Sequence, residues 1–542
     1  MQLQKFEKLA FTALILLSIV GGVMRFINLD FKEFWYDESY TALVLSGHTE
    51  VQLFENVVDR AVPFSDLRKF RTVGSDSTVP NISRALFESE PGHAPLFYLF
   101  NWLFCKAFGS TPFTFRFISA LISAFTLPVI FFLASETYRN RLLAALTTAF
   151  AALSPSLIYF AQEARDYSLG LFFMFLSNAF LLYSLRTGKR SGWFAYGFAL
   201  VLGLYSWLLS VCAALGQVFF VLLGKERRKK YWREFLGTFL IAVLIFGPWL
   251  YLIKVNSSTL LRTYSWLEPS VPYDALVNVW LTTFCKAFAL FGWQTAHYEW
   301  LLIGITFVEF LSFAVAARFL RGPKYLQLCI IVVWFVIFAG QDLLLGGARS
   351  APFRYQTMVI GCTLILFASL AEWLFTLRIT ALNAVAVTVM SLFIGIESFS
   401  SVALLQEKNW PNKAIKMRLT YPIGQYFTSL HAPLLVCERS RINLVELLDL
   451  SQVAPPDSGF LYMKDVNDSP FPASADEFYI WNASAALEKR CKVEGYSVIQ
   501  RVEGVPCLKR VSVGANAHAP TPDSASASAS ASASASAPAA AK

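Results

Sequence analysis

The feature that most constrains this chain is a series of long apolar runs separated by short polar loops. A helix needs about 20 mainly apolar residues to cross a bilayer, and helical spans fit these continuous runs better than barrel strands, which alternate in polarity. We therefore predict an all-α polytopic membrane protein with about 11–13 transmembrane helices. The clear spans are expected at 9–25, 112–136, 142–160, 168–185, 193–208, 209–224, 235–253, 300–319, 326–345, 356–375 and 379–398.

Charge in the loops predicts the orientation of these helices. The net charge is +9, and most basic clusters lie in short loops between apolar runs, which is typical of cytoplasmic loops rather than of a nucleic-acid partner. A further apolar stretch, 94–108, is short and carries Lys106. If it does not complete a crossing and the N-terminus is inside, the basic loops all fall inside. The outside then receives 26–111, 161–167, 254–299, 346–355 and everything after about 400.

Composition divides the chain into three parts. Residues 1–403 form the predicted transmembrane domain, with a large first extracytoplasmic loop at 26–111. Residues 404–513 are more polar and predict a small extracytoplasmic α/β domain, with strand-like alternation near its end. Residues 514–542 are rich in alternating Ser and Ala and predict a disordered tail.

Two adjacent carboxylates stand first among the candidate site residues. Asp37 and Glu38 follow Trp35 and Tyr36, at the predicted extracytoplasmic edge of the membrane. A carboxylate walled by aromatic rings can accept a proton from an attacking hydroxyl or amine, or help to hold a divalent cation. The alternative is an interfacial aromatic belt whose acids merely face water.

A second outer turn carries the sequence QEARDY, at residues 162–167. A guanidinium at Arg165 could bind a phosphate through two parallel donors, with nearby acids orienting it. The candidate substrate-binding residues of this turn are Gln162, Glu163, Arg165 and Tyr167. The alternative is a local Glu–Arg pair that caps helix ends.

Further cations and imidazoles lie on the same predicted side. Arg349 and Arg354, followed by Tyr355, occupy an outer turn where the positive-inside tendency gives no reason for arginine, so an anionic ligand is one explanation and contact with lipid phosphates the other. His93 is a further candidate substrate-binding residue, and both His93 and His297 could be metal ligands, proton carriers or structural groups. The identity of any metal is therefore unknown, and the one cofactor for which these residues give a reason is a divalent cation.

The order of these motifs resembles the GT-C superfamily of membrane glycosyltransferases, over about residues 10–375. The nearest branch joins protein mannosyltransferases (family 39) and the aminoarabinose lipid A transferase. The motifs are WYDE at 35–38, HAPLFY at 93–98, QEARDY at 162–167 and RY at 354–355. The family pattern commonly has an acid directly before His-Pro-Pro-Leu. Here Gly92 precedes His93, Ala94 replaces the first proline, and Glu90 lies two residues earlier.

The resemblance implies an inverting glycosyltransferase that takes a hexosyl or pentosyl group from a polyprenyl-phosphate carrier. It implies that Asp37 is the catalytic carboxylate, that Glu38 supports it, and that Arg165 and Arg354 lie beside the donor phosphate. The acceptor would be a lipid, a glycan or a protein, and the location a bacterial plasma (inner) membrane with an extracytoplasmic active site. The competing hypotheses are a polytopic transporter or lipid flippase, and a non-catalytic scaffold of the same fold.

Overall fold

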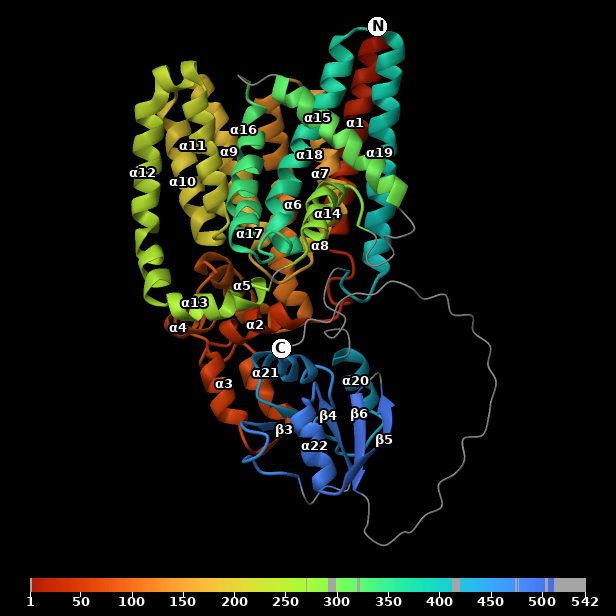
Figure 1. The fold of residues 1–542 in the computed structure, drawn as a ribbon. Helices are drawn as coiled ribbons and strands as arrows, with labels where there is room; N and C mark the ends of the chain where they lie inside the picture. Colours follow the sequence, from red (N-terminus) through yellow and green to blue (C-terminus); the bar gives the residue numbers. More distant parts are fainter. Residues whose placement is uncertain are drawn as a thin grey trace, which may run out of the picture.

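A bundle of apolar helices forms the larger part of the computed structural model, which describes residues 2–269, 271–290, 299–318, 322–411, 420–472, 475, 477–502 and 505–510 (Figure 1). Eight described helices are long and apolar enough to cross a membrane, or nine if one bent pair counts as a span. The eight are α1 (Gln2–Met24), α6 (Pro112–Tyr138), α9 (Tyr167–Thr187), α12 (Lys225–Val255), α15 (Glu299–Arg318), α18 (Phe353–Thr376), α19 (Thr380–Gln406), and the run of α16 (Tyr325–Trp334), η4 (Phe335–Ala339) and α17 (Gly340–Leu345).

The other predicted spans are also helices, but they are broken or shorter. α7 (Arg141–Leu153) and α8 (Pro155–Ala161) form the bent pair, at 58°. Pro155 starts the second helix, because proline has no N–H to continue the hydrogen-bond ladder of the first. α10 (Arg190–Ser206) has 17 residues and α11 (Ser210–Leu223) has 14, and they pack against α9 and α16 respectively. The predicted polytopic helical fold is thus confirmed.

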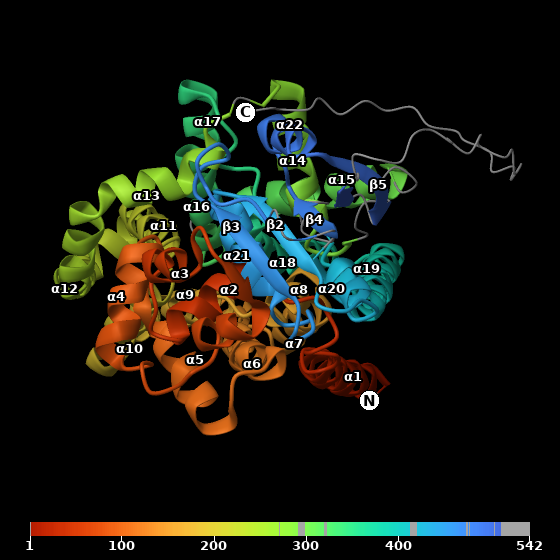
Figure 2. The same cartoon turned by 90° about the horizontal axis from the view of Figure 1, so that it is seen from below.

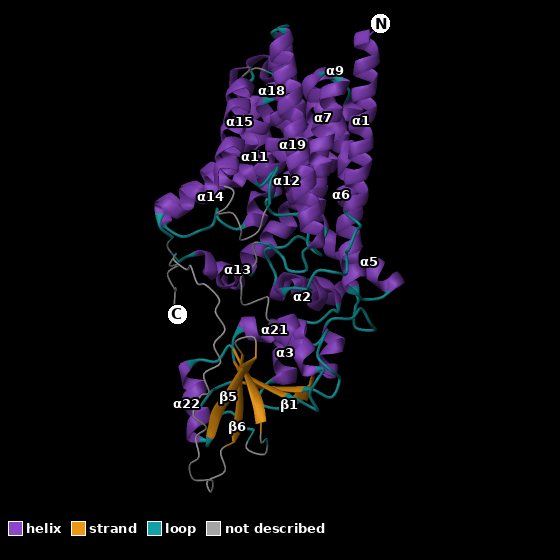
Figure 3. Ribbon diagram, turned by 90° about the vertical axis from the view of Figure 1, so that its right-hand side faces the viewer, coloured by secondary structure: helices purple, strands orange, loops and turns teal. Residues whose placement is uncertain are grey.

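The ambiguous apolar stretch forms α5 (Pro95–Phe108), a helix of 14 residues. It is not among the helices that meet the length and hydropathy requirements for a span. It lies at the lower end of the bundle, level with the helices of the first outer loop (Figures 1 and 3). This position agrees with a segment that does not cross.

The two ends of the bundle differ in what they carry. The N-terminus lies at one end, and the α/β domain lies beyond the other (Figure 1). Because successive helices alternate in direction, the turns after α6, α9 and α11 share the N-terminal end, and three of the basic clusters lie in these turns or in the helix ends beside them. The first outer loop, the turn at 162–166 and the turn at 346–352 share the opposite end, so the candidate site residues are gathered there.

Short helices and one strand make up the outer segments. The first outer loop contains α2 (Tyr36–Leu45), α3 (Glu50–Val57), β1 (Ala61–Pro63), η1 (Phe64–Phe70) and α4 (Val79–Ser89). The segment predicted as a loop at 254–299 is helical over much of its described part, as α13 (Ser257–Tyr264), η2 (Ser265–Leu267) and α14 (Tyr273–Cys285).

The C-terminal segment has the predicted α/β character. It contains α20 (Thr420–Phe427), β2 (Leu434–Glu438), α21 (Arg441–Leu450), β3 (Gly459–Met463), β4 (Glu477–Trp481), α22 (Ala485–Val493), β5 (Tyr496–Val502) and β6 (Val505–Arg510). The sheet has the order β1-β3-β2-β4-β6-β5, with parallel pairing of β2 to both β3 and β4 and antiparallel pairing elsewhere. Seen from below, the sheet crosses the end of the bundle beside α2 and α3 (Figure 2).

The first outer loop and the C-terminal segment share one hydrophobic core. Strand β1 comes from the outer loop and pairs with β3, Val62 lying opposite Phe460. Tyr40 and Leu43 of α2 belong to the same buried cluster as Val445 and Leu448 of α21. Together these contacts make the outer loop and the α/β segment one packed unit, on which α2 is held from two sides.

Candidate active site

A cavity of about 1780 Å³ opens where the outer loop, the end of the helix bundle and the C-terminal domain meet. Part of its wall is apolar and comes from the bundle, with Leu208, Leu209, Leu250, Ile253 and Phe338 among its members. A smaller part of the wall is polar and includes Asp37, Glu90, His93, Arg165, Arg354 and Arg441. A cavity with an apolar and a polar part can accept a molecule that carries both an apolar and a charged part.

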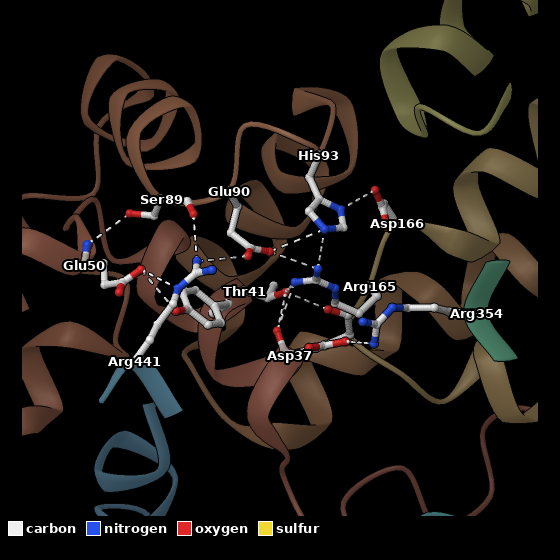
Figure 4. A network of polar contacts seen from close by, with 12 residues as sticks. Asp37, Thr41, Glu50, Ser89, Glu90, His93, Arg165, Asp166, Arg354 and Arg441 are labelled. Carbon is white, nitrogen blue, oxygen red and sulfur yellow. Dashed lines mark hydrogen bonds and ion pairs between the residues drawn. The ribbon is translucent and has the colours of Figure 1, made fainter. Parts of the chain in front are cut away.

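Asp37 reaches this cavity from the first turn of α2. Trp35 precedes the helix in an extended conformation, and the two acids that follow it lie where the helix dipole favours negative charge. Arg354, at the start of α18, donates from Nη1 to Asp37 Oδ2 at 2.8 Å (Figure 4). The Arg354 guanidinium also lies over the ring of Trp266, 5.1 Å from its centroid. The structure thus brings together two predicted site residues that are 317 positions apart in the sequence.

Arg165 lies behind this pair at the centre of a buried polar network (Figure 4). Its Nη1 donates to the backbone oxygen of Asp37 at 3.0 Å, and its Nη2 donates to Glu90 Oε2 at 3.0 Å. His93 Nε2 is 2.6 Å from the same Nη2, and His93 Nδ1 is 2.9 Å from Asp166 Oδ2. With Nδ1–H donated to Asp166, a neutral His93 accepts from Arg165, so the imidazole fixes the direction of the guanidinium.

The charge of Arg165 is stabilised although the side chain is buried. Burial by itself lowers the pKa of a guanidinium, but Tyr98, Glu90 and Asp37 together hold the pKa of Arg165 well above its usual value. Its Nε is buried and has no hydrogen-bond partner among the described residues. Arg165 lines the cavity, so its charge favours an oxyanion bound there.

Glu38 points away from the cavity and is fully buried. It accepts from Arg116 Nε at 2.7 Å and Arg116 Nη2 at 2.5 Å, and from the backbone N–H of Ala164 at 2.9 Å. Arg116 also donates to the backbone oxygens of Leu29, Lys32 and Glu33. Glu38 thus ties α2 to α6 and to the turn of Arg165, while Asp37 faces the cavity.

Two residues of the predicted phosphate-binding turn are buried within the protein rather than in the cavity wall. Gln162 donates from Nε2 to the backbone oxygen of Ile27 at 2.7 Å, and both Gln162 and Glu163 are buried outside the cavity wall. Their placement gives them no contact with a molecule in the cavity. Arg165 and Tyr167, from the same turn, do line it.

Arg349 and Tyr355 also line the cavity. The backbone N–H of Arg349 donates to Asp342 Oδ1 at 2.7 Å, and its Nη1 lies 3.7 Å from the same oxygen. Its charge is therefore largely balanced by Asp342, whereas Arg354 faces Asp37. Of the two arginines in this turn, Arg354 is the one joined to the polar network.

Several groups at the site were not singled out from the sequence. Arg116 could have been found from the sequence, because a charged residue within an apolar helix is expected to be paired or functional. Tyr264 and Trp266 line the cavity from the segment predicted as a loop, and burial raises the pKa of Tyr264 well above its usual value. Arg441 enters from the C-terminal domain, and nothing in its sequence context indicated this.

Within the described ranges, no group of three or more His, Cys, Asp or Glu side chains is arranged to hold a metal ion. His93 is engaged by Asp166 and Arg165, and His297 lies outside the described residues. The divalent cation left open by the sequence stays a prediction.

Comparison with known proteins agrees with this architecture. Residues 92–252 match a family model described as dolichyl-phosphate-mannose-protein mannosyltransferase, a range that includes His93 and Arg165. The chain is similar to the structure of ArnT from Cupriavidus metallidurans bound to undecaprenyl phosphate, at 15% identity and a TM-score of 0.54, covering 93% of this chain and 99% of that one. The apo form of that ArnT gives 13% identity, a TM-score of 0.53 and the same coverage. No curated protein matches the chain. The GT-C fold expected from the motifs is therefore confirmed.

Proposed function

We propose that this GT-C-fold protein is an inverting glycosyltransferase that moves a monosaccharide from a polyprenyl-phosphate carrier to an acceptor. The observation that carries the proposal is the 2.8 Å pair of Asp37 and Arg354 in a cavity that is lined by both apolar and charged side chains. A carboxylate can take a proton and a guanidinium can hold a phosphate, and here the two lie within reach of one bound molecule.

The donor would bind across the apolar and the polar parts of the cavity wall. Its polyprenyl chain would lie on the apolar wall from α11 and α12, and its phosphate would meet Arg354, with the charge of Arg165 beside it. A guanidinium has five donors, so Arg354 can donate to a phosphate while it still donates to Asp37 and orients it. The undecaprenyl phosphate bound to the similar ArnT supports a carrier of this class.

The chemistry would be a single displacement at the anomeric carbon. Asp37 removes the proton from an acceptor O–H or N–H as its O or N forms the new glycosidic bond. The bond from the anomeric carbon to the phosphate oxygen breaks, and the electron pair leaves with the polyprenyl phosphate. Arg165 and Arg354 stabilise the charge on that phosphate, which lowers the barrier for its departure. Attack opposite to the leaving group inverts the anomeric configuration.

The acceptor and the side of the membrane belong to the same proposal. Residues of α3, α4 and α21 line the cavity beyond the helix bundle, and a lipid, glycan or protein acceptor would reach Asp37 from this aqueous side. The basic loops lie at the opposite end of the bundle, which favours an extracytoplasmic site in a bacterial plasma membrane.

Transfer of labelled sugar from a panel of polyprenyl-phosphate hexoses and pentoses tests the proposal, with purified protein in nanodiscs and a membrane fraction as the acceptor source. We expect transfer by the wild type and by Asp66→Asn, an exposed carboxylate of the same outer loop, and a loss of about 10²–10⁴-fold in Asp37→Asn. Donor binding without transfer by the wild type would favour the non-catalytic scaffold. Equal transfer by wild type and Asp37→Asn would remove Asp37 from the mechanism.

A further inference from the structure

Arg441 extends from the C-terminal domain and lines the cavity beside other charged side chains. It is the first residue of α21, whose N-terminus is capped by the Ser440 hydroxyl. Its Nε donates to Glu50 Oε2 at 2.9 Å, and its Nη2 donates to the backbone oxygen of Ser89 at 3.0 Å (Figure 4). The guanidinium also lies over the ring of Tyr40, 4.8 Å from its centroid. One side chain thus contacts α2, α3 and the end of α4.

Glu90 connects Arg441 to the centre of the site. Glu90 Oε1 lies 3.7 Å from Arg441 Nη2, while Glu90 Oε2 accepts from Arg165 at 3.0 Å and lies 3.4 Å from His93 Nε2. Arg165 in turn contacts the backbone oxygen of Asp37. A continuous series of charged contacts therefore runs from the C-terminal domain through Glu90 and Arg165 to Asp37.

The position of Arg441 is fixed by the packing around it. Asp449, two turns further along α21, accepts a hydrogen bond from Ser39 of α2. Arg71, after η1, donates to the backbone oxygen of Ser451 at 3.1 Å. With the shared core and the β1–β3 pairing, these contacts hold α21 against the outer loop, so Arg441 meets Glu90 in a defined place.

We propose that Arg441 is a positioning residue of the transferase, and that the C-terminal domain is through this residue a part of the active site. The inference rests on the proposed function. Without Arg441, Glu90 would keep Arg165 as its one guanidinium partner among the described residues, and Glu50 would lose its contact with the Arg441 guanidinium. Arg165 alone would then balance Glu90, which would draw Arg165 away from the cavity and weaken its hold on the donor phosphate.

Steady-state kinetics of Arg441→Gln, Arg441→Lys and the control Arg490→Gln test the proposal. Arg490 lies on α22 of the same domain and contacts Val466 and Phe471, far in the chain from the site residues. We expect Arg441→Gln to raise the donor KM about tenfold, the effect of losing one charged contact, with the acceptor KM unchanged. Arg441→Lys keeps the charge and should recover part of this loss, and Arg490→Gln should behave as wild type.

A double variant separates positioning from a general loss of structure. Glu90→Gln removes the charge that Arg441 balances, so adding Arg441→Gln to it should change the donor KM by less than about twofold, since both substitutions interrupt the same series of contacts. Additive effects of the two substitutions, or an unchanged donor KM in Arg441→Gln, would overturn the proposal.

Hydrogen exchange provides a measurement that needs no substrate. We expect faster exchange over residues 86–93 in Arg441→Gln than in the wild type or Arg490→Gln. If the wild type transfers no sugar, the proposed function fails, and the exchange result still decides the positioning role. Unchanged exchange over this segment would show that Arg441 does not hold Glu90 in place.

Discussion

Asp37 and Glu38 are adjacent carboxylates for which the structure predicts opposite phenotypes. Asp37 faces the cavity and pairs with Arg354 in a partly exposed contact, with side-chain exposures of 12% and 22%. The side chains of Glu38 and its partner Arg116 are both 0% exposed. The same chemical change, a carboxylate replaced by its amide, should therefore remove activity at one position and stability at the next.

The expected magnitudes follow from these environments. Removing one partner of a buried ion pair leaves an uncompensated charge and costs about 3–5 kcal/mol, so we expect Glu38→Gln to lose stability of this order. Arg116 keeps three backbone acceptors, which moves the loss toward the lower end. The Asp37–Arg354 pair is less buried and borders the cavity, so losing it should cost less stability than this, whereas loss of the base costs about 10²–10⁴-fold in rate.

Thermal unfolding in nanodiscs and sugar transfer, measured on both variants, give the comparison. Transfer is measured well below the unfolding temperature of Glu38→Gln, so that its folded fraction is assayed. The reasoning is refuted if Glu38→Gln unfolds at the wild-type temperature and yet loses transfer as severely as Asp37→Asn. That result would mean that Glu38 meets the substrate and that α2 turns in the working enzyme.

Three further outcomes are expected. Burial raises the pKa of Asp449 well above its usual value, so the stability of the wild type falls as pH rises from the ordinary carboxyl pKa toward this raised pKa. Asp449→Asn can still accept from Ser39 and does not ionise, so its unfolding temperature should rise relative to that of the wild type as pH rises. A difference in unfolding temperature that stays constant with pH would contradict this. Arg354→Lys should raise the donor KM about tenfold or more because it loses the paired donors, and unchanged donor binding in a filter assay would exclude Arg354 from the phosphate site. A Cβ at position 92 would lie 2.2 Å from the Tyr264 hydroxyl, so Gly92→Ala should lower transfer with little change in unfolding temperature, while full transfer would mean that Tyr264 moves freely.

The membrane fold was predictable because lipid imposes a simple rule on sequence. Each spanning helix must present about 20 apolar residues, and this length is visible without knowledge of packing. Loop charge then indicates which turns share an end of the bundle. The candidate residues Asp37, His93, Arg165 and Arg354 could be grouped by this argument alone, and the structure joins all four in one network.

The roles within each motif were less accessible. Asp37 and Glu38 are neighbours in sequence, but successive residues of a helix lie about 100° apart, so one faces the cavity and the other Arg116. No feature of the sequence shows which of the two acids lies on the side of α2 that faces the cavity. Likewise Gln162 and Glu163 share a motif with Arg165 but are turned into the protein, because this tight turn leaves room at the cavity for only some of its side chains.

The contribution of the C-terminal domain could not be read from sequence because it depends on contacts between distant segments. Arg441 meets Glu50 across 391 positions, and β1 is a strand only because β3 is beside it. These contacts also argue against treating the domain as an appended module. Helix α2 carries Asp37 on one face and packs against α21 on another, so the place of the proposed base is set by the bundle and by the C-terminal domain together. Removing residues after α19 would expose the apolar face of α2 and of the outer loop, and we expect it to abolish the site rather than to release an independent membrane enzyme.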